Sequence, residues 1–114
     1  MPAIQEKQLG QSRPTDTSAA SIYSPASNTT AVARTIYICN TTASSESYYI
    51  YVDDDSTTYD QSTAICYATP INAYTTVKLE TFIAMNNPDG NLAIKSSTGS
   101  ALTFTVFGIE ITSN

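Results

Sequence analysis

The stretch that decides the fold is "ALTFTVFGIEI", residues 101–111. Its first half alternates between apolar and polar side chains, which is typical of a β-strand with one buried face. Leu102, Phe104 and Val106 form that apolar face. Similar alternating runs recur along the chain between turn-forming residues, whereas no segment has the periodicity of a helix. The sequence therefore predicts an all-β protein.

Seven segments in total have the composition and length of strands, and they recur at intervals of roughly 8 to 14 residues. This spacing predicts an antiparallel β-sandwich of about seven or eight strands, either a jelly roll or immunoglobulin-like. Pro70 predicts that residues 63–71 form an edge strand or contain a bend, because proline cannot donate a hydrogen bond to a neighbouring strand. The segments are residues 21–27, 31–40, 47–53, 63–71, 75–85, 91–96 and 101–111.

Residues 1–20 differ from the rest of the 114-residue chain because they are polar and nearly lack large apolar side chains. Pro2, Gly10 and Pro14 interrupt any regular element there. We therefore expect an extended N-terminal arm that is ordered against a partner or against the protein's own surface. The length of the remainder predicts one β-sandwich domain, residues 21–114.

The composition argues against several classes of function. The chain has no His, which removes the commonest general base and metal ligand, and no nucleophile motif is present, so we expect no enzyme and no cofactor. Its net charge is −5 and its five Lys and Arg residues are scattered, which argues against nucleic-acid binding. No apolar run has the length of a membrane span or the character of a secretion signal, so we expect a soluble protein made in the cytosol.

An acidic window, "YVDDDSTTYD", covers residues 51–60. Asp53 and Asp55 stand at alternate positions, as in calcium loops, but Thr58 replaces the required glycine and Ala64 the final glutamate. We interpret the window as a solvated loop between strands. A looser calcium site that uses Asp53, Asp55 and Asp60 stays open as the alternative.

The second half of the last strand has apolar residues on both faces. Phe107, Ile109 and Ile111 point away from the first face. A bulge at Gly108 would return the two isoleucines to the core, whereas a subunit interface would cover them where they are. Tyr49 and Tyr51, predicted on the exposed face of their strand, are further interface candidates because Tyr is enriched at interfaces. The five interface candidates are thus Tyr49, Tyr51, Phe107, Ile109 and Ile111.

The two cysteines, Cys39 and Cys66, lie in predicted strands and have no metal-binding spacing. Free thiols are the expected state in a reducing compartment, and a disulfide between neighbouring strands stays open as the alternative.

One longer stretch supports a family resemblance. Residues 10–42 contain Gly10-Gln11, Pro14, "IYSPA" and a strand that ends in Cys39-Asn40. This pattern resembles the opening of small virion proteins of tailed bacteriophages, and the similarity continues over roughly residues 8 to 111.

The resemblance implies a structural protein of the virion. The first expectation is a capsid decoration, or cement, protein that is made in the host cytoplasm and stabilises the capsid exterior. Such a protein is expected to be a homo-oligomer, with a trimer favoured, and to bind the major capsid protein or other virion proteins. The alternatives are a neck, tail or fibre component, and a receptor- or carbohydrate-binding sandwich with a sugar platform of Tyr48, Tyr49, Tyr51 and Tyr59.

Overall fold

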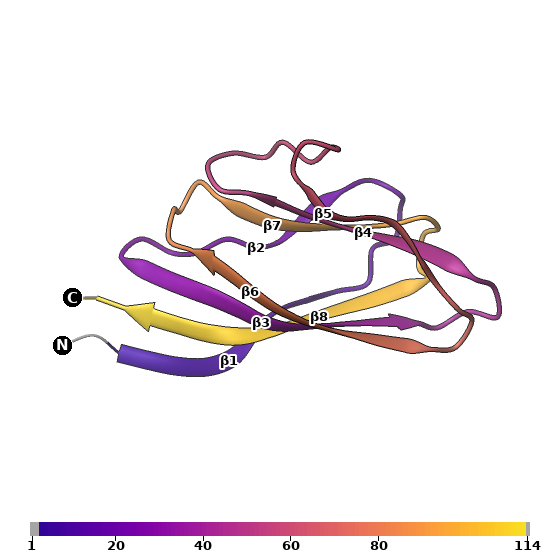
Figure 1. The fold of residues 1–114 in the computed structure, drawn as a ribbon, viewed down its shortest axis with the longest axis horizontal. Coiled ribbons are helices and arrows are strands. Elements are labelled where there is room, and N and C mark those ends of the chain that lie inside the picture. Colours follow the sequence, from indigo (N-terminus) through magenta and orange to yellow (C-terminus); the bar gives the residue numbers. More distant parts are fainter. Residues whose placement is uncertain (1–2, 114) are drawn as a thin grey trace.

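Eight β-strands make up the regular structure of residues 3–113, the part of the chain that the computed structural model describes (Figure 1). Each of the seven predicted segments overlaps one of them, which confirms the all-β prediction. Residues 1–2 of the predicted arm and residue 114 of the predicted domain lie outside the described residues. The strands are β1 (Ala3–Ser12), β2 (Ala20–Tyr23), β3 (Thr29–Asn40), β4 (Glu46–Asp53), β5 (Ala64–Ile71), β6 (Thr76–Met85), β7 (Asn91–Ser96) and β8 (Leu102–Thr112).

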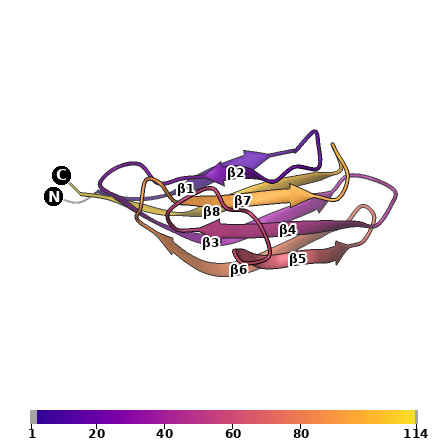
Figure 2. The same cartoon turned by 90° about the horizontal axis from the view of Figure 1, so that it is seen from above.

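The strands form two antiparallel sheets that pack face to face (Figure 1). We call β1-β8-β3-β6 the first sheet and β2-β7-β4-β5 the second sheet, and Figure 2 shows the order of the second sheet from above. Among the described strands, β4 and β5 are the only consecutive pair within one sheet. This order matches the double Greek key of a jelly roll, whereas immunoglobulin domains pair several consecutive strands. The sandwich is therefore of the jelly-roll type.

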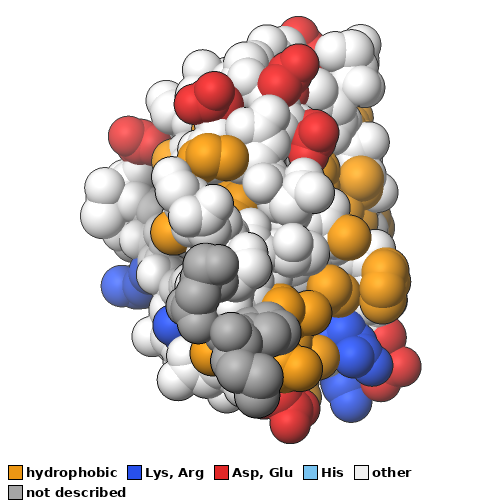
Figure 3. Space-filling view, turned by 90° about the vertical axis from the view of Figure 1, so that its left-hand side faces the viewer, with side chains coloured by type: hydrophobic (Ala, Val, Ile, Leu, Met, Phe, Trp, Pro, Cys, Tyr) orange, Lys and Arg blue, Asp and Glu red, His pale blue; other side chains and the backbone are white. Residues whose placement is uncertain are grey.

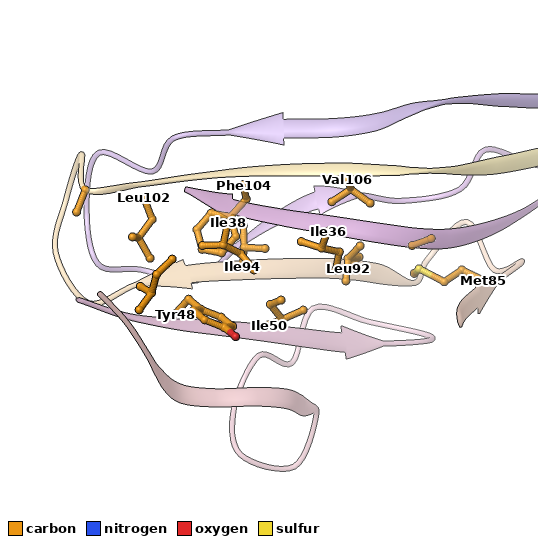
Figure 4. Close-up of a cluster of buried hydrophobic side chains, with 13 residues drawn as sticks. Ile36, Ile38, Tyr48, Ile50, Met85, Leu92, Ile94, Leu102, Phe104 and Val106 are labelled. Atoms are coloured by element: carbon orange, nitrogen blue, oxygen red, sulfur yellow. The ribbon is translucent and has the colours of Figure 1, made fainter. Parts of the chain in front are cut away.

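The hydrophobic core fills the space between the two sheets (Figure 4). Leu102, Phe104 and Val106 of β8 are fully buried there, as their alternation predicted. They meet side chains such as Ile50 of β4 and Ile94 of β7 from the second sheet. Inward-facing residues of both sheets thus make one continuous core, which is what holds a sandwich together.

The predicted arm contributes a strand to the sandwich. Residues 3–12 are extended, but they pair with β8 as β1, an edge of the first sheet. The first six residues of β1 are exposed, while Leu9 packs against the core. Within the described residues, the predicted arm is therefore an edge strand and a loop rather than a separate extension. A mostly exposed edge strand lacks the alternation by which a sequence reveals a strand.

The register breaks of the first sheet lie beside β8 and not within it. Leu9 is an extra residue in β1, opposite the step between Val106 and Phe107, and Arg34 is an extra residue in β3, opposite the step between Phe107 and Gly108. Gly108 faces the core, where an added Cβ would lie 2.1 Å from the carbonyl oxygen of Val32. The bulge predicted at Gly108 is therefore wrong, because both neighbouring strands bulge instead and β8 keeps its alternation.

A polar contact joins the two sheets near the described ends of the chain. The hydroxyl of Tyr23 in β2 donates a hydrogen bond of 2.5 Å to Glu110 in β8, and the Lys7 ammonium lies 3.1 Å from the other carboxylate oxygen. The Tyr23 hydrogen bond, aided by Lys7, lowers the pKa of Glu110. Burial, followed by the nearby carboxylate, raises the pKa of Tyr23. The charged form of Glu110 is thus favoured in the folded protein.

Candidate functional site

The outer face of the first sheet carries the apolar residues predicted at the end of β8. Phe107 is 39% exposed, and Ile109 and Ile111 are partly exposed on the same side. Ile4 of β1 pairs with Ile111 and is 71% exposed. Phe82 of β6 is 74% exposed. We call this set, with Val32 of β3, the outer apolar face; its members are Ile4, Val32, Phe82, Phe107, Ile109 and Ile111.

A groove of about 530 Å³ crosses the outer apolar face. Phe107 and Ile109 line it together with charged side chains of β1 and β3, namely Glu6, Lys7 and Arg34. Figure 3 looks onto the end of the molecule near the chain termini, where hydrophobic side chains reach the surface beside Lys and Arg side chains. The face thus combines exposed apolar area with charges of both signs.

The outer face of the second sheet is different, because the chain covers part of it. Tyr51 was predicted to be exposed, but it is 2% exposed and lies against Tyr59 of the β4–β5 loop, with ring centroids 6.3 Å apart. Tyr49 is half-buried and meets the ring of Tyr67 edge-on at 5.0 Å. Burial is the main cause that raises the pKa of Tyr51. The prediction that Tyr51 is an exposed interface residue is therefore wrong in this chain.

A hollow of about 640 Å³ lies between the β4–β5 loop and the second sheet. We call it the tyrosine hollow. Tyr48, which we predicted as part of a sugar platform with three other tyrosines, is instead buried in the core. The ammonium of Lys95, on β7, lies 4.5 Å from the centroid of the Tyr49 ring beside the hollow. The hollow is lined by Tyr51, Tyr59, Tyr67, Asp60, Gln61 and Lys95.

The acidic window forms the covering loop. The Asp53 carboxylate accepts hydrogen bonds from the hydroxyl of Ser56 at 2.7 Å and from the backbone N–H of Thr58 at 2.9 Å. These bonds, the Ser56 bond first, lower the pKa of Asp53. Asp60 accepts two bonds from Ser62 through one oxygen, and they likewise lower its pKa. The carboxylates thus organise the loop, as side-chain-capped turns do.

The structure does not bring Asp53, Asp55 and Asp60 together as a metal site. Within residues 3–113, no group of three or more His, Cys, Asp or Glu side chains is placed to hold a metal ion. A side-chain hydrogen bond to Asp53, followed by the charge of that carboxylate, raises the pKa of Asp55. The geometry therefore assigns these carboxylates to turn formation.

The two cysteines lie on different sheets, Cys39 on β3 and Cys66 on β5, and both are free thiols. Burial raises the pKa of Cys66, so this thiol is poorly ionised. Among the described residues there is also no helix with the length and hydrophobicity that crossing a membrane requires.

Structural comparison relates the fold to viral particles. A chain in the crystal structure of the T13 particle of infectious bursal disease virus is 10% identical with a TM-score of 0.56, over 97% of this chain and 31% of that one. A chain of the Gx strain of the same virus is 12% identical with a TM-score of 0.57, over 98% and 33% of the two chains. The protein thus spans about a third of the length of these chains. At such low identity the likeness concerns the fold alone.

The tobacco streak virus coat protein is also similar, with 11% identity and a TM-score of 0.47, over 98% of this chain and 86% of that one. No protein-family model matches the sequence, and no curated protein sequence matches it.

Several residues of these two surfaces escaped the sequence analysis, among them Val32 and Gln61. Ile4 was hidden in a segment predicted as an arm, and Phe82 lay on the polar side of its strand. Phe82 was detectable, because a large apolar residue between Glu80 and Ala84 breaks the polar face of β6. Two others are Tyr67 and Lys95, whose positions beside Tyr49 depend on the pairing of β5 and β7 with β4.

Proposed function

We propose that this protein is a structural component of a bacteriophage virion, a decoration (cement) protein that binds the capsid exterior and stabilises it. The observation that carries the proposal is the outer apolar face, on which Phe82 is 74% exposed and Ile4 71% exposed. Several large apolar side chains exposed on one face of a sheet are typical of binding sites between proteins. The likeness of the whole chain to part of a viral particle protein supports the virion as the place of binding.

The stabilising mechanism is burial of apolar area across joints between subunits. Each 100 Å² of apolar surface removed from water contributes roughly 2.5 kcal/mol, and stable interfaces bury about 800 Å² on each partner. The partners are the major capsid protein or other virion proteins, and further copies of this chain, with a trimer as the favoured oligomer. Tyr49, which is half-buried, and the outer apolar face provide the contacting residues. The role requires no catalysis and no cofactor.

Co-sedimentation with capsids that lack the protein tests the proposal. A double variant, Phe82→Ser with Phe107→Ser, is expected to weaken capsid binding by about tenfold or more, because large apolar anchors dominate interface energies. The matched control is Tyr74→Ser, since Tyr74 is 72% exposed in the turn between β5 and β6, outside this face. Undiminished capsid binding by a folded double variant would contradict the proposal.

Neck, tail and fibre locations are distinguished from the capsid by electron cryo-microscopy of intact particles. A decoration protein is expected at repeated positions over the whole shell. Density confined to one vertex, or to the tail, would show that the protein is a neck, tail or fibre component instead.

A further inference from the structure

The tyrosine hollow shares no residue with the outer apolar face and lies on the other sheet. Its floor is formed by strand residues, including Tyr67 and Lys95, and one wall by the loop residues Tyr59, Asp60 and Gln61. Of the capsid contacts proposed above, Tyr49 alone is near this hollow, and it does not line it. The hollow therefore calls for a separate explanation.

The size and the lining of the hollow suit a small polar molecule. Its volume of about 640 Å³ lies within the range of roughly 300 to 1,000 Å³ that is typical of ligand pockets. Asp60, Gln61 and Lys95 bring a carboxylate, an amide and an ammonium to it. A protein partner would need a much wider contact surface. The hollow thus favours a small ligand over a protein segment.

The aromatic side chains are held in fixed positions before any ligand arrives. The Tyr67 ring is 49% exposed and is supported edge-on by Tyr49. Tyr51 is buried beneath Tyr59, and Tyr49 is stacked on Tyr51 at 6.4 Å. Rigid tyrosines offer a large amphipathic contact area at a low cost in conformational entropy. A ligand that packs on Tyr67 would therefore lose little free energy in ordering its site.

The charges around the hollow select the class of ligand. The position over the Tyr49 ring that would attract a cation is already taken by the Lys95 ammonium, 4.5 Å from the ring centroid. Asp60 and Lys95 both line the hollow with opposite charges, so a ligand with a net charge of either sign gains no net attraction there. A neutral molecule with both apolar and hydroxyl-bearing faces matches these conditions.

We propose that the tyrosine hollow binds a neutral saccharide. The C–H face of a sugar ring packs against the exposed ring of Tyr67. The sugar hydroxyls donate to the Asp60 carboxylate, of which one oxygen is engaged by Ser62, and exchange hydrogen bonds with the Gln61 amide and the Lys95 ammonium. This activity goes beyond capsid binding, and its residues can be altered without touching the outer apolar face.

The test uses the purified full-length protein on an array of neutral oligosaccharides of hexoses and N-acetylhexosamines, with sialylated and sulfated glycans beside them. We expect binding to at least one neutral glycan and weaker or no binding to the acidic ones. By calorimetry with that glycan, Tyr67→Ala is expected to weaken binding by about tenfold, as the loss of one aromatic contact does. Tyr67→Phe keeps the ring and is expected to retain most of the affinity.

The control is Phe82→Ser, on the other sheet, which is expected to leave glycan binding unchanged. Three results would overturn the proposal: no neutral glycan is bound, acidic glycans alone are bound, or Tyr67→Ala binds the neutral glycan as well as the unaltered protein. Loss of capsid binding by Tyr67→Ala, without glycan binding by the unaltered protein, would also overturn it and would identify the hollow as a protein contact. The glycan-binding measurements use the purified protein without capsids, so a negative result in the capsid-binding test does not change how they are interpreted.

Discussion

The outer faces of the two sheets differ in what covers them. On the second sheet the β4–β5 loop folds back, so that Tyr51 is only 2% exposed although it points away from the core. On the first sheet no described loop covers the equivalent surface, and Phe82 stays 74% exposed. In the same two-sheet fold, a loop therefore covers part of one outer face, around Tyr51, and the other outer face is left open. The difference shows that an apolar residue on an outer strand face is an interface signal only where the chain's own loops do not reach it.

The largest expected effect is on stability, at the covered outer face of the second sheet. Tyr51→Ala is expected to lower the free energy of unfolding by about 3 kcal/mol, because it removes a buried aromatic ring and leaves a cavity. Its exposed counterpart, Phe82→Ala, is expected to change the free energy of unfolding by no more than about 0.5 kcal/mol. Urea titration of both variants gives the measurement. Equal losses in the two variants would mean that the loop does not cover Tyr51 in solution.

A smaller effect is expected where the two sheets are joined. Tyr23→Phe removes the hydroxyl that donates to Glu110, and it is expected to lower the free energy of unfolding by about 1 kcal/mol. The folded protein lowers the pKa of Glu110 from its ordinary 4.5. The stability that this group contributes is therefore present above about pH 4.5 and is lost as the pH falls through the lowered pKa.

In Tyr23→Phe the pKa of Glu110 is expected to move back up, because its main hydrogen bond is gone. Between about pH 4.5 and the lowered pKa, the variant therefore loses less stability than the unaltered protein, and the difference in stability between the two proteins narrows as the pH falls. Urea titrations from pH 7 to pH 3 measure the shift, and a matching acid profile in both proteins would show that this contact does not join the sheets.

The smallest expected effect is on the opening of the β4–β5 loop, which covers Tyr51. Asp53→Asn keeps one acceptor oxygen but replaces the oxygen that accepts from Ser56 and Thr58 with a donor. The loop is expected to open more often, and the Thr58 amide to exchange its hydrogen faster, while the midpoint of global unfolding changes little. Hydrogen exchange followed by nuclear magnetic resonance measures this, with the Tyr74 amide, which donates to the Thr42 carbonyl outside this loop, as an internal reference. An unchanged exchange rate at the Thr58 amide would show that the Asp53 carboxylate does not hold this loop in place.

Seven of the eight strands were predictable because their inward faces repeat every second residue and turn-forming residues separate them. Pro70 was correctly placed, since β5 is an edge strand of the second sheet. β1 was not predictable as a strand, because its first six residues are exposed on both sides and carry no alternation. The choice of a jelly roll over an immunoglobulin fold also required the structure, since both orders suit the same strand spacing.

The candidate sites were predictable only in part. Alternation puts Phe107, Ile109 and Ile111 on the face opposite the core, and a bulge at Gly108 was the alternative that would have returned the two isoleucines to it. The structure keeps all three on the outer face. The bulge residues that allow this, Leu9 and Arg34, lie in other strands and gave no signal in the sequence of β8. The tyrosine hollow was not predictable as a unit, because its members meet through strand pairing and a loop.

The sequence by itself determined the class of fold, the inward faces of the strands and the apolar character of the β8 surface. These properties depend on side-chain alternation within single segments, which is local information. The tertiary structure alone decided which outer face is covered, which strands are edges and which tyrosines meet. These properties depend on how distant segments pair and on the path of one loop, because burial on an outer face is a property of neighbours and not of the residue itself.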